Sequence, residues 1–145
     1  MIQAELNQQQ LRGGERLPRA VLEQALSAVS KQLGIKKTVS VSIAFVDKKT
    51  MKSLNKTYRG KDAVTDVLSF TLGSPELLGE LILSYDQAKI QAKTQKHSVR
   101  SELVFLIIHG LLHLHGYDHE QPKQAKQMFA LQENILQSLG INPAL

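Results

Sequence analysis

The sequence predicts an α+β fold in which a small mixed four-stranded sheet is surrounded by about five helices. Segments in which apolar and small polar residues alternate are typical of half-buried strands, and they are interspersed with longer segments of helical periodicity. The segment 99–114 is apolar nearly all round, which predicts a buried central helix. With 145 residues and no repeat or linker, the chain is expected to form a single domain over residues 1–145.

The N-terminal part is expected to contain a helix, a strand and a short second helix. Pro18 is placed to open an amphipathic helix that Gly34 ends. Residues 39–45 alternate between large apolar and small side chains, which predicts a half-buried strand. Asp47 is a favourable N-cap for the short helix, whose Met51 would face inward.

Two further strands and a helix are expected in the middle of the chain. The strands correspond to residues 67–71 and 78–84, so three of the four strands can be placed from the sequence. Ser84 and Gln87 have the spacing of a capping box for a helix that continues to about residue 93.

Two helices complete the prediction. Ser98 is a potential cap for the apolar helix of residues 99–114. Pro122 opens a final amphipathic helix, and Gly140 stops it. The apolar helix would then lie inside the domain and the final helix on its surface.

Three histidines around the end of the apolar helix have the spacing of metal ligands. His109 and His113 are four residues apart, so on a helix their rings lie on one face about 6 Å from each other. Gly116 can take the left-handed conformation that ends a helix and lets the chain bring His119 back. Polar side chains on an apolar helix lower the stability of the fold unless a metal ion binds their ring nitrogens. This cost favours a metal site over three unrelated histidines.

Three protein ligands indicate a catalytic site, because structural zinc sites are usually closed by four. No cysteine is available to complete a closed site. Asp118 could be a fourth ligand, but it is better interpreted as accepting a hydrogen bond from a ligand imidazole or from the turn backbone. His115 should face away from the metal, and both it and His97 are interpreted as partly buried or surface histidines.

Composition limits the classes of protein that the chain can belong to. The absence of cysteine excludes disulfides, a thiolate nucleophile and iron–sulfur clusters, and is compatible with a reducing cytosol. No signal-peptide pattern or membrane-spanning run is visible, so we expect a cytoplasmic protein with no membrane partner. Residues 1–61 hold 12 Lys/Arg and 4 Asp/Glu, whereas residues 62–145 hold 6 and 9. This asymmetry favours a polyanionic partner such as nucleic acid, and the alternative is that the lysines are simply solvated.

The motif His-Gly-x-Leu-His-Leu-x-Gly-Tyr-Asp-His at residues 109–119 resembles the signature of the YbeY family, which are bacterial metal-dependent endoribonucleases implicated in ribosomal RNA maturation. Residues 55–62, 65–70 and 79–84 also agree with the family in order and spacing, so the resemblance covers nearly the whole chain. Three differences are mild: Val64 stands where a proline is common, His115 where an aliphatic residue is common, and Glu80 where the family usually has Asp.

The resemblance implies one Zn²⁺ per chain, held by His109, His113 and His119, and a functional arginine at Arg59. It implies a zinc-dependent, single-strand-acting endoribonuclease in maturation of the 16S rRNA 3′ end and in ribosome quality control. RNA is then the main partner, and ribosomal small-subunit proteins or GTPases are further candidates. His113 and Arg59 would be the catalytic residues, with Arg59 also binding substrate.

The chemistry of these residue types agrees with that assignment. A three-histidine metal with an open position can polarise a phosphoryl oxygen or lower the pKa of a bound water. The Arg59 guanidinium matches phosphate bidentately, although on residue chemistry alone it could equally be a solvated cation. Tyr58 or Tyr117 could stack on a base, but packing is the more common role for such residues.

Two other functions remain open at this stage. The ligand spacing is also that of metzincin proteases, but Gly110 stands where those enzymes need a general-base glutamate. The metal could instead organise a ribosome- or RNA-binding maturation factor without cleavage activity of its own. The absence of an obvious general base favours this last alternative, since Glu80, Glu102 and Asp118 are candidates without a known geometry.

Overall fold

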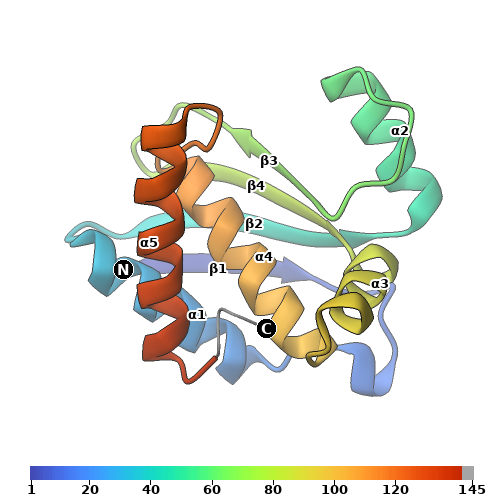
Figure 1. The fold of residues 1–145 in the computed structure, drawn as a ribbon, viewed down its shortest axis with the longest axis horizontal. Coiled ribbons are helices and arrows are strands. Elements are labelled where there is room, and N and C mark those ends of the chain that lie inside the picture. The colour runs from blue at the N-terminus through green and yellow to red at the C-terminus, as the bar shows by residue number, and fades with distance from the viewer. Residues whose placement is uncertain (142–145) are drawn as a thin grey trace.

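The computed structural model describes residues 1–141, so the last four positions of the predicted 1–145 domain lie outside it. The described part contains a four-stranded sheet and five α-helices (Figure 1), as the sequence predicts. The strands are β1 (Ile2–Asn7), β2 (Val39–Val46), β3 (Val67–Thr71) and β4 (Leu77–Ser84). The helices are α1 (Arg19–Leu33), α2 (Lys48–Arg59), α3 (Tyr85–Gln95), α4 (Val99–Leu114) and α5 (Pro122–Ser138), and a 3-10 turn covers Gly13–Glu15.

The sheet is mixed, as predicted, with the strand order β1-β2-β4-β3. β2 pairs in parallel with both β1 and β4, and β3 pairs antiparallel with β4. Val41, Ile43 and Phe45 of β2 are buried, while the small residues between them are half-buried. One face of the sheet therefore contributes to the core, where α1, α4 and α5 pack together, and α4 crosses in front of the sheet (Figure 1).

The local signals in the sequence correspond to real element boundaries. Gly34 ends α1 in the left-handed conformation, with a φ of 64°. The Asp47 side chain accepts a hydrogen bond from the Thr50 amide at the start of α2. The Ser84 hydroxyl accepts from the Gln87 amide at 3.2 Å and caps α3.

β1 is the fourth strand, which the sequence analysis did not place. Its residues Ile2 and Ala4 are buried and alternate with exposed neighbours, so the strand has a period of two. It forms an edge of the sheet and pairs with β2, from Ile2 beside Val39 to Asn7 beside Ala44. The pairing is parallel and joins segments that are far apart in sequence.

α4 is the buried central helix that the apolar pattern predicts, and it lies directly against the sheet. Ten of its 16 residues are buried. At Gly110 the helix packs closely on the sheet, because a Cβ added there would lie 2.6 Å from Cδ2 of Leu81 on β4. α5 covers another side of α4 and buries Met128, Gln132 and Ile135. Of the helices within residues 1–141, none is long and apolar enough to cross a membrane.

Candidate metal centre

The three predicted metal ligands come together at the C-terminal end of α4. His109, His113 and His119 each offer a ring nitrogen, and these atoms all lie within 4.8 Å of one another. The Nε2 atoms of His109 and His113 are 3.1 Å apart. Tetrahedral zinc with Zn–N bonds of about 2.05 Å separates its ligand nitrogens by about 3.3 Å. The three histidines could therefore hold one metal ion without rearrangement of α4.

The turn after α4 places His119. Gly116 takes a φ of 94°, and the amides of Gly116 and Tyr117 return to the carbonyls of His113 and Leu112 at 3.0 Å each. Asp118 accepts a hydrogen bond from the His119 amide at 2.7 Å, which is the turn-backbone role considered above. The carboxylate therefore stabilises the segment that carries the third ligand.

The other two histidines stay outside this cluster. A ring nitrogen of His115 lies 2.7 Å from the carbonyl oxygen of Leu111 one turn earlier, so the ring is used locally. His97 is half-buried, and its Nε2 atom lies 2.6 Å from Oε1 of the buried Glu102. These contacts agree with the interpretation of both residues as partly buried histidines without a metal role.

Gln132 contacts the histidine cluster from α5, and it is not among the site residues predicted from the sequence. Its Oε1 atom lies 2.9 Å from Nδ1 of His109, and the residue is buried. An amide oxygen only accepts, so Nδ1 of His109 carries the proton and its Nε2 presents a lone pair toward His113. The signal was present in the sequence, because Gln132 is four residues from Met128 on the inward stripe of α5.

Burial favours the neutral form of the two histidines on α4. It lowers the pKa of His109 and His113 from the ordinary value of 6.5, and positive charge on a neighbouring histidine acts in the same direction. Hydrogen bonding to Gln132 raises the pKa of His109 and Asp118 raises that of His113, but neither reverses the shift. Neutral imidazole is the form that binds a metal ion.

Two phenylalanines flank the ligand rings. Phe105 stacks on His109 with 6.1 Å between ring centroids, and Phe129 stacks on His119 at 6.2 Å. Phe129 is 46% exposed, so one side of the cluster is covered by a ring that also faces solvent. The two stacks restrict the orientation of the His109 and His119 rings.

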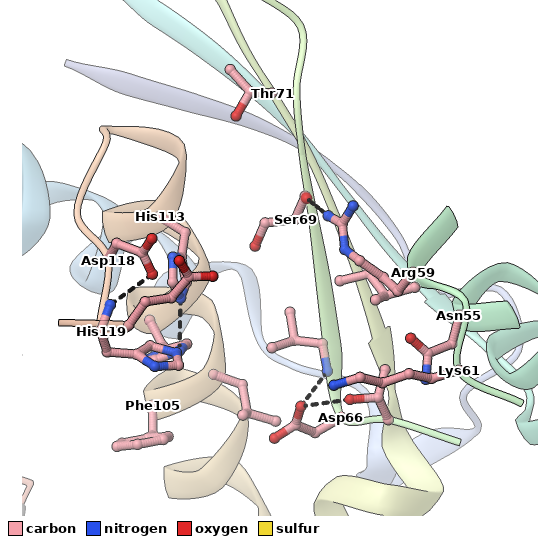
Figure 2. A pocket seen from close by; sticks show the side chains of 16 residues that line it. Asn55, Arg59, Lys61, Asp66, Ser69, Thr71, Phe105, His113, Asp118 and His119 are labelled. Carbon is pink, nitrogen blue, oxygen red and sulfur yellow. Dashed lines mark hydrogen bonds between the residues drawn. The ribbon is translucent and has the colours of Figure 1, made fainter. Parts of the chain in front are cut away.

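The histidines form one wall of a cavity of about 710 Å³, and Arg59 and Lys61 lie on the opposite wall (Figure 2). Arg59 belongs to the last turn of α2. Its Nη2 atom donates to the backbone carbonyl of Ser69 at 2.6 Å, and its guanidinium lies 5.0 Å from the centroid of the Phe70 ring. The structure thus brings Arg59 and the three histidines to one pocket, although they are 50 or more residues apart.

Asp66 is a further pocket carboxylate, which the sequence analysis includes only as part of a segment that agrees with the family. One of its oxygens accepts from the Val67 amide at 2.7 Å and from the Thr65 hydroxyl at 3.3 Å, and the other accepts from the Gln91 amide nitrogen at 3.1 Å. Its charge also raises the pKa of His109, in opposition to burial. Asp66 therefore lies within electrostatic reach of the histidines.

Of the three carboxylates considered as a general base, only one lies in the pocket. Asp118 lines the pocket, whereas Glu80 and Glu102 do not. Glu80 is exposed on β4, and Glu102 is buried in its contact with His97. Tyr58 is 59% exposed and meets the Phe70 ring edge-on, while Tyr117 packs against the core.

Fold and site together define a small α+β protein in which three histidines that could hold a metal ion face an arginine across a pocket. The family model described as Endoribonuclease YbeY matches residues 3–140. The chain therefore belongs to the YbeY family, as the motif at residues 109–119 predicts.

Individual relatives agree with this membership. The chain is 41% identical to a protein of Lysinibacillus sphaericus, with 83% of the chain and 85% of the relative covered. It is 45% identical to a protein of Ureaplasma urealyticum, with 82% and 79% covered. Both relatives carry the name Endoribonuclease YbeY. The fold is similar to the solution structure of TM1509 from Thermotoga maritima, with a TM-score of 0.62, 28% identity and coverage of 97% of this chain and 92% of that one.

Proposed function

We propose that the protein is a zinc-dependent endoribonuclease that cleaves single-stranded regions of RNA in the cytoplasm. We place its action in the maturation of ribosomal RNA, including the 16S rRNA 3′ end, and in ribosome quality control. The observation that carries the proposal is the pocket in which three potential metal ligands face Arg59. The relatives named Endoribonuclease YbeY support RNA as the substrate.

His109, His113 and His119 would hold the ion, because three imidazoles without a fourth protein ligand suit a catalytic zinc site. When bound, zinc supplies Lewis acidity toward a phosphoryl oxygen and lowers the pKa of a coordinated water. Gln132 fixes the tautomer of His109, and Asp118 fixes the turn that carries His119. These two contacts keep the ligand set in place before substrate arrives.

Arg59 would bind the phosphate group next to the site of cleavage. Its guanidinium is permanently charged and has five N–H donors, of which the bond to Ser69 uses one. The remaining donors can reach a phosphate in the pocket, and the stack on Phe70 limits the motion of the side chain. Lys61 adds a second positive charge on the same wall.

Asp66 is the carboxylate that we assign to accept a proton during cleavage. Three donors hold it in place, and they leave room for a further hydrogen bond at a carboxylate that offers about four lone-pair sites. In Figure 2 it lies beside Lys61, on the side that faces the histidines. Asp118 also lines the pocket, and we assign it the other role, in which its hydrogen bond from the His119 amide holds the turn that carries His119.

The structure gives no support to peptide hydrolysis. Gly110 stands at the position of the metzincin glutamate, and it faces Leu81 of the sheet rather than the pocket. A glutamate side chain at this position would have to enter the core. The RNA-binding factor without cleavage activity shares the histidines and Arg59 with the proposed enzyme, so an experiment has to separate these two.

The test is cleavage of a labelled, structured RNA by protein of measured zinc content, beside His113→Ala and His115→Ala purified in the same way. We expect wild type and His115→Ala to bind zinc and cut, because the His115 ring is used locally. We expect His113→Ala to lose zinc and cutting together. Equal cutting by all three would indicate a contaminating nuclease. Zinc binding without cutting by wild type would favour the RNA-binding factor.

A further inference from the structure

α2 and its flanks carry most of the net charge of the protein. Residues 47–62 hold six Lys/Arg and two Asp/Glu, a net charge of +4, whereas the whole chain has a net charge of +5. In Figure 1 α2 projects from one corner of the domain, away from α1 and α5. The positive charge is therefore concentrated on one projecting element.

Four of these cations form a stripe along the helix: Lys48, Lys52, Lys56 and Arg59. At 3.6 residues per turn they lie within an arc of about 80°, and at 1.5 Å per residue they extend over about 16 Å. All four are exposed, whereas Met51 and Asn55 are buried. The stripe ends at Arg59, which lines the pocket. The cations therefore form a path along α2 to the histidine wall.

Contacts within the protein do little to stabilise the positive charges of the stripe. Among the described residues, Lys52 is the only one of its lysines with a carboxylate within 4.0 Å, namely Asp62, and that pair is exposed. Lysines four residues apart on a helix repel each other and destabilise it, which applies to Lys48 with Lys52 and to Lys52 with Lys56. A partner that brings negative charge would relieve this repulsion.

Nucleic acid fits this surface better than an acidic protein. Protein interfaces are depleted of lysine and rely on apolar and aromatic side chains at their centre. The only large apolar side chain of α2 that is exposed is Tyr58, which lies beside Arg59 against Phe70. Lysines next to an exposed aromatic ring are instead typical of proteins that bind single-stranded nucleic acid. In such proteins the cations contact phosphates, and a base stacks on the aromatic ring.

We propose that the stripe on α2 binds the sugar–phosphate backbone of the RNA strand outside the pocket and guides the strand past Tyr58 to Arg59. This inference rests on the proposed function, since it takes RNA as the substrate. It assigns the holding of the strand to Lys48, Lys52 and Lys56 of α2, which lie outside the pocket. Lys48, Lys52 and Lys56 would contribute affinity that depends on salt concentration.

The test compares Lys52→Gln/Lys56→Gln with a matched control, Lys89→Gln/Lys93→Gln. Each variant removes two exposed lysines spaced four residues apart, from α2 or from α3. The measurement is the Kd for a fluorescent 2′-O-methylated single-stranded RNA at several salt concentrations, with intactness of the strand checked on a gel. Thermal melting monitors the fold of each variant.

For the α2 variant we expect weaker binding and a slope of log Kd against log salt reduced by about 1.4, or about 0.7 for each phosphate that a lysine no longer neutralises. The control should keep the wild-type slope. The proposal is overturned if the α2 variant binds like wild type, in which case an acidic protein becomes the expected partner of α2, or if both variants change equally. Because the measurement needs no cleavage, an inactive wild type would overturn the nuclease proposal while leaving this comparison intact.

Discussion

The wall of the pocket formed by α4 and the wall formed by α2 and β3 differ in burial, charge and number of supporting contacts. On the α4 wall, His109 is half-buried, contacts Gln132 and stacks on Phe105. On the α2 wall, Arg59 is exposed and is held by one hydrogen bond and one ring. Under the proposed function, the geometry of the histidines would depend on the core, whereas phosphate binding by Arg59 would depend on surface charge. The two functions should therefore be separable by mutation.

The largest effect should come from charge reversal on the α2 wall. Arg59→Glu would replace the proposed phosphate-binding cation by a repelling anion. We expect kcat/KM for RNA cleavage to fall by at least about 10- to 150-fold, since a hydrogen bond to a charged group contributes about 1.5–3 kcal/mol and the repulsion adds to this loss. Zinc content should stay at the wild-type level. Arg100→Glu makes the same change outside the pocket and should cleave normally. Loss of zinc from Arg59→Glu would show that the walls are coupled.

The second-largest effect should come from loss of the contact between Gln132 and His109 on the α4 wall. Gln132→Leu removes the acceptor for Nδ1 of His109, and we expect zinc affinity to fall by about 10- to 100-fold. Competition with a chromophoric chelator measures this affinity. Gln132→Glu keeps an acceptor oxygen and should retain more of the affinity than Gln132→Leu. Equal affinity in all three proteins would remove Gln132 from the metal centre.

A smaller effect is expected where α4 meets the sheet. Gly110→Ala would place a Cβ 2.6 Å from Cδ2 of the fully buried Leu81. Overpacking costs about 1–3 kcal/mol, which exceeds the gain of about 1 kcal/mol in helix propensity. We expect the free energy of unfolding to fall by up to about 2 kcal/mol in urea denaturation. Adding Leu81→Val should recover part of the loss, and a stabilised Gly110→Ala would contradict the close packing.

The smallest effect concerns pH and the metal-free protein. Burial lowers the pKa of His109 and His113 below 6.5, so the folded chain binds fewer protons than the unfolded chain. The resulting stability is present above about pH 6.5 and is lost as the pH falls through the lowered values. Urea denaturation in chelator between about pH 5 and 8 should show this decline. His113→Asn should have a flatter profile, and an identical profile would contradict the prediction.

Most of the fold follows from local signals, and the exceptions depend on tertiary pairing. Gly34, Asp47 and Ser84 act where their chemistry predicts, because capping and termination involve neighbours in sequence. β1 was not placed although Ile2 and Ala4 alternate with polar residues. Its pairing with β2 is parallel and distant, so no hairpin turn marks it.

The site residues also fall into two groups: those that local spacing predicts and those that depend on tertiary packing. The spacing of His109 and His113 is a property of any helix, so the sequence is enough to predict that they lie together. Asp66 reaches the pocket only because β3 lies beside α4, and Gln132 reaches His109 only because α5 packs on α4. The sequence also left Glu102 as a possible base, and its contact with His97 became visible only in three dimensions.

The unequal anchoring of the three histidines has a consequence for the rate at which an ion is exchanged. His109 and His113 keep their separation as long as α4 is folded, whereas His119 is exposed on the turn that follows Gly116. An ion held by all three histidines could then enter and leave when this turn opens, while the core stays folded. Loading of a metal, or its removal by a chelator, would in that case need no unfolding of the chain.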